Sequence, residues 1–364
     1  METDAAKVLD LAPPTAETLY WLAYLRRDTN VLARAEAASP EFVFPFRTES
    51  IPVFEWAARQ RSGWQPSYFL ALIRWYLGDW EEARRLLTAC GDEPHFAPFY
   101  AARAQLATGD AAADLRRAAQ LDRAQWRYGV MLARQSLKRD DPASALAVAG
   151  DYARRFPAND TLALLRAKAL LLTGQYWAAA ELLDSLHVLP AEGTTEAHAL
   201  FREANLLLAV ARLQTGAFDD ALRLVSLARQ WPERLGAGKP YPADVDERLE
   251  DWLTAQCYVA LKNPVKARQA LDRILAIPAR PPGRQGTGDL IRAMALRRSG
   301  RLAEAEQLLR DWQARDAVSE LANWGVELFA GRPAPLTASL QDLDCRVLDG
   351  IARVGFRPDP LPGE

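Results

Sequence analysis

Three histidines are the first candidates for chemistry, because an imidazole can bind a metal ion and can move a proton near neutral pH. They are His95, His187 and His198. No two of them have the H-x-x-x-H or H-x-x-E-H spacing that places two ligands on one face of a helix. We therefore expect loop or surface positions for all three, with no metal site and no cofactor.

A glycine-rich segment, residues 236–241, reads Gly-Ala-Gly-Lys-Pro-Tyr and superficially resembles a phosphate-binding loop. That motif needs a glycine five residues before the Gly-Lys pair and a Ser or Thr directly after the lysine. The chain has Glu233 and Pro240 at those two positions. The segment is therefore not a phosphate cradle.

Five carboxylates follow this segment and could in principle supply an acid–base pair. They are Asp244, Asp246, Glu247, Glu250 and Asp251. Acidic residues at the start of a helix also complement its dipole and cap its free N–H groups. We expect this structural role, and we identify no catalytic residue.

The charge balance gives no sign of a nucleic-acid or membrane partner. The chain has 45 Lys and Arg against 47 Asp and Glu, so it has no strong overall field. Its most apolar segment, residues 161–173, contains Arg166 and Lys168 and is shorter than the roughly 20 residues that span a bilayer. We expect neither nucleic acid nor membrane as a partner.

The cysteines and the N-terminus indicate a cytoplasmic location. Cys90, Cys257 and Cys345 are odd in number, far apart and without a C-x-x-C spacing, which is typical of buried free thiols in a reducing compartment. Residues 1–14 lack the basic start and the long apolar stretch of a secretory signal.

The elements that must position any site are helical hairpins that recur along the chain. Turn residues recur at separations of 31, 31, 34, 42, 46 and 38 residues, at Gly78, Gly109, Asp140, Gly174, Gly216, Lys262 and Gly300. Seven residues before each turn there is an alanine: Ala71, Ala102, Ala133, Ala167, Ala209, Ala255 and Ala293. Five residues after each turn there is again an alanine, except for Asp114 in the second repeat: Ala83, Ala145, Ala179, Ala221, Ala267 and Ala305.

Small side chains at two fixed positions allow two antiparallel helices to approach closely. Gly or Asp at the turn suits the left-handed backbone that ends a helix. Lys262 fits this position poorly, and we expect Asn263 to take the left-handed conformation instead. Prolines close several of the hairpins, at Pro157, Pro190, Pro232 and Pro278.

These features resemble the tetratricopeptide repeat, a helix–turn–helix unit of 34 residues with small residues where its helices meet. The resemblance covers roughly residues 64–315 and implies an all-α, right-handed superhelical solenoid of about seven antiparallel helix pairs. We expect residues 1–62 to form an N-terminal helical cap, with two helices in 16–60, and 63–316 to form the repeat array. Residues 317–364 are expected to hold a C-terminal cap with two helical segments and a proline-rich tail.

The resemblance also implies a function, because members of this family usually bind ligands in a groove lined by the first helix of each pair. Six residues before the turn, three consecutive repeats have Arg103, Arg134 and Lys168, and Arg127 is expected to face the same groove. Our hypothesis is a non-catalytic scaffold that binds a protein or peptide segment with acidic groups. Aromatic contact would come from Tyr68, Trp75 and Phe99.

An alternative interpretation of these residues remains open; we call Arg103, Arg134 and Lys168 the basic stripe. The same cations could pair with carboxylates of adjacent helices and contribute little beyond solubility.

A second candidate surface is the loop of residues 231–241, which is longer than a hairpin connection requires. Long ordered loops are often functional, so this loop could project and dock on another domain. Its candidate contact residues are Trp231, Glu233, Arg234, Lys239 and Tyr241.

A further resemblance suggests an alternative function. Residues 44–47, 97–100, 126–128 and the loop are similar to the C-terminal helical region of large bacterial proteins that begin with a β-rich domain related to sugar enzymes. This resemblance implies an accessory module of a carbohydrate-active enzyme, with a β-rich partner domain. Tyr68, Trp75, Phe99 and Trp252 would then stack on sugar rings.

Overall fold

The computed structural model describes residues 2–60, 63–191, 193–241, 244–278, 286–315, 318–332, 334–337, 340 and 342–353. Within these residues the regular elements are α-helices and two short 3-10 turns, with no β-strand. The all-α prediction is therefore confirmed. The predicted proline-rich tail and the insertion at Glu192 lie outside the described residues.

The chain forms two compact units, residues 1–135 and residues 136–364. Their boundary lies inside helix α9 (Trp126–Lys138). It falls within the predicted repeat array, so packing divides the chain differently from the repeat pattern, whose expected boundaries were after residues 62 and 316.

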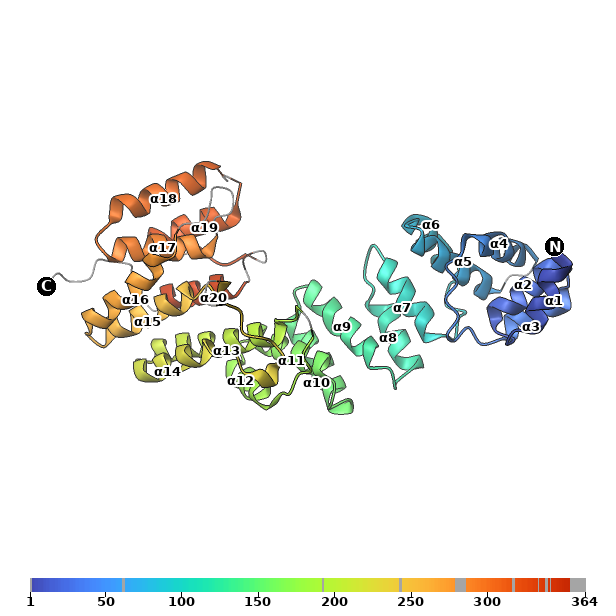
Figure 1. Cartoon of the computed structure of the whole chain (residues 1–364), viewed down its shortest axis with the longest axis horizontal. Helices are drawn as coiled ribbons and strands as arrows, with labels where there is room; N and C mark the ends of the chain where they lie inside the picture. Colours follow the sequence, from blue (N-terminus) through green and yellow to red (C-terminus); the bar gives the residue numbers. More distant parts are fainter. Residues whose placement is uncertain are drawn as a thin grey trace. The chain divides into compact units, whose positions relative to one another are not determined.

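Six of the seven predicted hairpins lie within one unit and form packed helix pairs, and consecutive helices can be followed in Figure 1. In chain order they are α5 (Trp64–Tyr76) with α6 (Trp80–Ala89), α7 (Ala97–Leu106) with α8 (Ala112–Leu121), α11 (Asp160–Leu172) with α12 (Tyr176–Ser185), α13 (Glu196–Gln214) with α14 (Phe218–Ala228), α15 (Arg248–Ala260) with α16 (Pro264–Ala276), and α17 (Thr287–Arg298) with α18 (Leu302–Arg315). The remaining predicted hairpin, α9 and α10 (Pro142–Arg155), spans the boundary between the two units.

The repeated alanines are buried where the paired helices meet. All thirteen are at most 6% exposed, and most are fully buried. A larger side chain at these positions would push the two helices apart. The alanine spacing that defined the repeats therefore coincides with buried positions in the helices.

The turn between the helices has the expected left-handed backbone in six of the seven hairpins, Gly109 being the exception. Lys262 itself has a φ of 55°, so our prediction that Asn263 takes this conformation is wrong. Asn263 is instead the N-cap of α16, where its side chain accepts a hydrogen bond from Lys266 N–H at 3.1 Å. Capping stabilises Asn at that position, so the strained conformation moves to the residue before it.

The N-terminal residues contain more helices than we predicted. Residues 16–60 form α2 (Ala16–Arg26), α3 (Thr29–Ala37), the 3-10 turn η1 (Thr48–Ser50) and α4 (Ile51–Gln60), preceded by α1 (Glu2–Asp10). The predicted two helices are therefore three, because Arg27 adopts a φ of 53° and ends α2 before Asp28 caps α3. Phe54 and Phe69 pack on the buried ring of Tyr20 and anchor the core of this unit.

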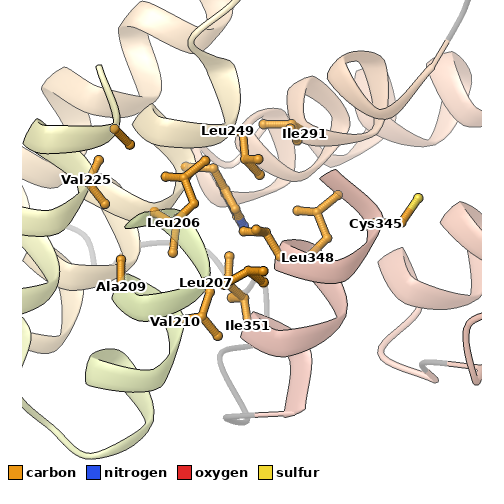
Figure 2. Packing of buried hydrophobic residues seen from close by; sticks show 14 of the residues in the cluster. Leu206, Leu207, Ala209, Val210, Val225, Leu249, Ile291, Cys345, Leu348 and Ile351 are labelled. Carbon is orange, nitrogen blue, oxygen red and sulfur yellow. The ribbon is translucent and has the colours of Figure 1, made fainter. Parts of the chain in front are cut away.

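Two helices follow residue 317, as predicted: α19 (Glu320–Phe329) and α20 (Leu343–Arg353). Helix α20 packs against α13, and Figure 2 shows its Leu348 and Ile351 directed at Leu207 and Val210. Leu348 and Ile351 are each 2% exposed. The approach is close enough that a Cβ on Gly350 would lie 2.8 Å from Val210 Cγ1.

Polar contacts fix the register of α20. Asp344 accepts a hydrogen bond of 2.6 Å from the Thr287 hydroxyl on α17, and Arg346 forms an ion pair with Glu203 on α13. The first helices of two hairpins in the second unit therefore contact a helix of the same chain.

The three cysteines are free and buried, as expected. Burial raises the pKa of the Cys90 thiol to about 11 and that of Cys257 to about 12. Burial also raises the pKa of Cys345.

Candidate binding surfaces

Arg103, the first cation of the predicted basic stripe, is paired with two carboxylates of its own unit. Its guanidinium donates to Asp114 at 2.7 and 2.9 Å and to Asp92 at 2.9 Å. The hydrogen bond to Asp114 raises the pKa of Arg103. For this residue the alternative interpretation, internal pairing, agrees with the structure.

The repeat pattern explains this pairing. Asp114 occupies the position where the other six repeats have alanine. The single departure from the pattern therefore supplies the partner of the first stripe cation.

The other predicted basic residues are exposed. Arg134 on α9 and Lys168 on α11 belong to different compact units. Arg127 donates to Gln125 Oε1 at 3.1 Å and lies over the Trp126 ring.

Three of the four aromatic residues expected to line a groove or to stack on sugar rings are buried. Tyr68 and Trp252 are 2% exposed and Phe99 is fully buried, while Trp75 is half-buried. The periodicity placed them on the first helices correctly, but they face the neighbouring helix. Our expectation of aromatic contact with a ligand is therefore wrong for Tyr68, Phe99 and Trp252.

The loop of residues 231–241 packs on its own unit over its first half. Trp231 stacks on His198 with ring centroids 3.4 Å apart, and Arg234 forms an ion pair with Asp184. Val188 N–H donates to the Arg234 carbonyl at 2.8 Å. This half of the loop covers the hairpin end rather than projecting from it.

The second half of the loop is more open. Tyr241 is 81% exposed and Lys239 is also exposed, while Glu233 is an exposed residue of the first half. Gly236 lies between the two halves and has a φ of 68°. A Cβ there would lie 2.8 Å from the Val188 carbonyl oxygen, so this position favours glycine.

The carboxylates after this loop are neutralised by arginines from neighbouring hairpins. Glu250, which is 1% exposed, accepts two hydrogen bonds from Arg202 on α13. Asp251, which is 4% exposed, pairs with Arg229 at 2.8 Å and with Arg273 at 2.7 Å. They lie in the first turn of α15, as expected, but they also connect α15 to its neighbours.

Arg248 extends this network toward α17. It is 2% exposed, donates to Asp246 and lies 4.0 Å from Asp289. A Cβ on Gly288 would lie 2.2 Å from Arg248 Nη2, so only glycine leaves room for the guanidinium. Asp246, Glu250 and Asp251 thus each have an arginine partner, which supports a structural role for these three carboxylates.

A pocket of about 270 Å³ adjoins this network and is lined by His198, Trp231, Arg202 and Glu250. Burial lowers the pKa of His198, whose Nε2 lies 3.1 Å from the Gln230 carbonyl oxygen. His198 therefore packs within the fold instead of lying at the surface as we expected. The charged groups of the pocket wall named here are engaged in ion pairs.

The described residues contain neither a candidate metal site nor a candidate membrane span. No group of three or more His, Cys, Asp and Glu side chains in that part of the chain could hold a metal ion. No helix there is long and apolar enough to cross a membrane.

Three exposed aromatic side chains of the first unit lie on residues 41–47, between α3 and α4. Phe42, Phe44 and Phe46 are 91%, 68% and 52% exposed. Val43 and Pro45, which alternate with them, are buried. This alternation is what an extended segment produces, and Pro45 favours the extended backbone of Phe44.

Phe42 also has a strained backbone. Its φ is 59°, a left-handed conformation that is unusual for a bulky residue. The turn is closed by a hydrogen bond of 3.2 Å from Val43 N–H to the Pro40 carbonyl. An aromatic ring at 91% exposure contributes little to folding, so the fold does not explain why a phenylalanine is found here.

The segment borders a pocket of about 450 Å³ within the first unit. Its wall includes Phe42, Phe44, Phe96, Pro98 and Tyr128, with the carboxylates Glu41 and Asp122. The surface continues beyond the pocket, where the Phe46 ring meets that of Tyr76 on α5 at 5.8 Å. We name Phe42, Phe44, Phe46 and Tyr76 the aromatic surface, and the adjoining cavity the aromatic pocket.

From the sequence, residues 44–47 entered only the resemblance to the bacterial helical regions, and no binding surface was predicted there. The alternation Phe-Val-Phe-Pro-Phe is a partial signal, because it predicts Phe44 and Phe46 on one side of an extended segment. It does not predict the exposure of Phe42, whose left-handed backbone lies outside the extended segment.

The chain was compared with known proteins. No protein-family model matches it, and no curated protein matches it. Among solved structures, similar chains include PilW, a type IV pilus biogenesis factor, with 17% identity over 58% of this chain and 92% of that one, and a TM-score of 0.34. A chain of the Naa15/Naa10 complex bound to HypK-THB has 17% identity over 81% of this chain and 43% of that one, with a TM-score of 0.46.

A tetratricopeptide repeat protein from Parabacteroides merdae is similar over 86% of this chain and 97% of that one, with 14% identity and a TM-score of 0.37. These similarities are distant, and the description of the fold rests on the hairpins of this chain. The paired helices, left-handed turns and buried alanines give it a tetratricopeptide-like architecture.

Proposed function

We propose that the chain is a non-catalytic interaction scaffold that binds a peptide segment of a partner protein at the aromatic surface and aromatic pocket of its first unit. The observation that carries this proposal is Phe42, a phenylalanine with a left-handed backbone and 91% exposure at the rim of the pocket. Strained residues that the fold does not need are found at functional sites.

Three further features support the proposal. Aromatic side chains dominate the energetics of protein interfaces because they bury a large area with few rotatable bonds. The segment carrying them is held by buried Val43 and Pro45, so little backbone freedom is lost on binding. The carboxylates Asp246, Glu250 and Asp251 of the second unit are paired with arginines, which supports a structural role for these three side chains.

The test starts from peptides selected on the full chain from a random 12-residue phage library. Binding of the selected peptides is then measured by fluorescence anisotropy with the double variant Phe42→Ser, Phe44→Ser. We expect a loss of affinity of about tenfold or more, as for aromatic interface residues.

The matched control is Tyr241→Ser, which removes an equally exposed aromatic ring from the loop of the second unit. We expect unchanged affinity for this variant. If the Tyr241 variant loses binding while the double variant keeps it, or if no peptide is selected, the proposal fails.

A further inference from the structure

The aromatic pocket has two carboxylates and the exposed imidazole of His95 on its wall, but no lysine or arginine. Glu41 is exposed and Asp122 is half-buried. Neither carboxylate forms an ion pair with a cation in the part of the chain that the structure describes. Asp122 Oδ1 accepts one hydrogen bond, from Ala124 N–H at 3.0 Å.

Positive groups near the pocket offset these charges only in part. Helices α7 and α9 begin beside it, and each helix start carries about half a positive charge. The nearest arginine of α9, Arg127, is already bonded to Gln125 and lies over Trp126. Two full negative charges at the wall therefore outweigh two partial positive ones.

Aromatic faces combined with carboxylates match the chemistry of a cation with an apolar stem. The negative face of a phenyl ring attracts an ammonium or guanidinium group. The apolar stem of lysine or arginine packs against the same rings while its charge approaches the carboxylates. Phe42, Phe44 and Phe96 provide such faces on the pocket wall.

The aromatic surface adds a second requirement. Phe46 and Tyr76 continue beyond the pocket and present further apolar area, and the Arg47 guanidinium lies over the Phe46 ring, 5.8 Å from its centroid. A ligand that covers both regions needs large apolar side chains next to its cation.

From this arrangement the geometry points to a peptide with a lysine or arginine flanked by large apolar residues as the ligand of the aromatic pocket. The inference rests on the proposed function and specifies its partner. It reverses the acidic partner that we expected from the basic stripe, whose first member, Arg103, is paired internally.

The test uses the peptides selected on the full chain whose binding depends on Phe42. We expect a lysine or arginine next to Leu, Ile, Phe or Trp in these sequences. In peptides with arginine at this position, replacing it by citrulline, which keeps the shape and removes the charge, is expected to weaken binding about fivefold to tenfold.

Variants of the chain locate the charge effect. Glu41→Gln and Asp122→Asn together should abolish the preference for the charged peptide over the citrulline peptide and leave affinity for the latter unchanged. Asn keeps the oxygen that accepts from Ala124 N–H, so the local turn is retained. Glu81→Gln removes an exposed carboxylate of the same unit outside the pocket wall, and we expect it to have no effect on this preference.

Failure of the inference is distinct from failure of the proposed function. Peptides that depend on Phe42 but lack a basic residue, or bind equally well with citrulline, would overturn the inference alone. Binding that is independent of Phe42 would overturn the proposed function.

Discussion

The two units use similar helical hairpins but differ in how one apolar region of each is covered. In the second unit, α20 covers apolar residues of α13 and leaves Leu348 and Ile351 almost fully buried. In the first unit, the aromatic surface remains open, with Phe42 at 91% exposure. Both regions involve segments outside the repeated hairpins, residues 41–47 and α20, so the exposure of apolar groups depends on these segments as well as on the repeat.

The largest effect is expected in the charge network that connects the hairpins of the second unit. Glu250→Ala removes the main partner of Arg202 and leaves this partly buried cation with only the Asp344 carboxylate, 3.9 Å away. Loss of one partner of a buried pair costs about 3 to 5 kcal/mol; because Arg202 keeps some solvent contact, we expect the lower end of that range. Urea denaturation measures the change.

The control for this variant is Glu304→Ala, which breaks the exposed pair with Arg301. We expect it to leave the unfolding midpoint nearly unchanged. Equal changes in the free energy of unfolding for the two variants would show that the buried network stabilises the fold no more than an exposed ion pair does.

The next effect concerns the helix that covers α13. Ile351→Ala removes a side chain that is 2% exposed, and such truncations in a core cost about 2 to 5 kcal/mol. We expect protection from amide hydrogen exchange to fall in α20 and α13 and to stay unchanged in α5. Uniform loss of protection across both units would contradict the division of the chain into two packing units.

A smaller effect is expected where the paired helices meet. Ala167→Leu inserts a larger side chain at a fully buried position, which should cost about 1 to 3 kcal/mol. Ala113→Leu, at an exposed position of α8, is the control and should leave thermal unfolding close to that of the wild type. A neutral result for Ala167→Leu would contradict the assigned register.

The smallest effect on stability is expected at the aromatic surface. Phe42→Gly relieves the left-handed backbone at a φ of 59°, and this gain is roughly cancelled by the extra freedom of glycine in the unfolded chain, within about 1 kcal/mol. We therefore expect unfolding by urea to change little while peptide affinity falls. Marked destabilisation would show that the ring serves the fold and would weaken the contrast between the two units.

Local patterns in the sequence were sufficient for the hairpins. The alanine positions report a helix–helix contact that depends only on neighbouring residues in the chain, so Ala167 and Ala209 could be assigned from spacing. The pairing of Arg103 with Asp114 was also accessible, because Asp114 is the only interruption of the second alanine series.

Contacts between residues far apart in the chain were not accessible. The pairs Arg202 with Glu250 and Arg346 with Glu203 depend on which helices become neighbours in space. Whether an aromatic residue is buried also depends on which side of its helix faces a neighbouring helix. Phe99 lies on a first helix as predicted, but it is fully buried in the core. Exposure of Phe42 depends on a backbone conformation that its residue type disfavours, so no propensity argument would have found it.

The buried cysteines have a practical consequence for studying the two units. Thiol reagents attack the thiolate, and the raised pKa values of Cys90 and Cys257 keep both groups protonated at neutral pH while the units are closed. Cys90 belongs to the first unit, and Cys257 and Cys345 belong to the second. Each unit thus contains at least one cysteine whose alkylation requires the unit to open. The rates at which the three thiols are alkylated would report the opening of each unit without any added label.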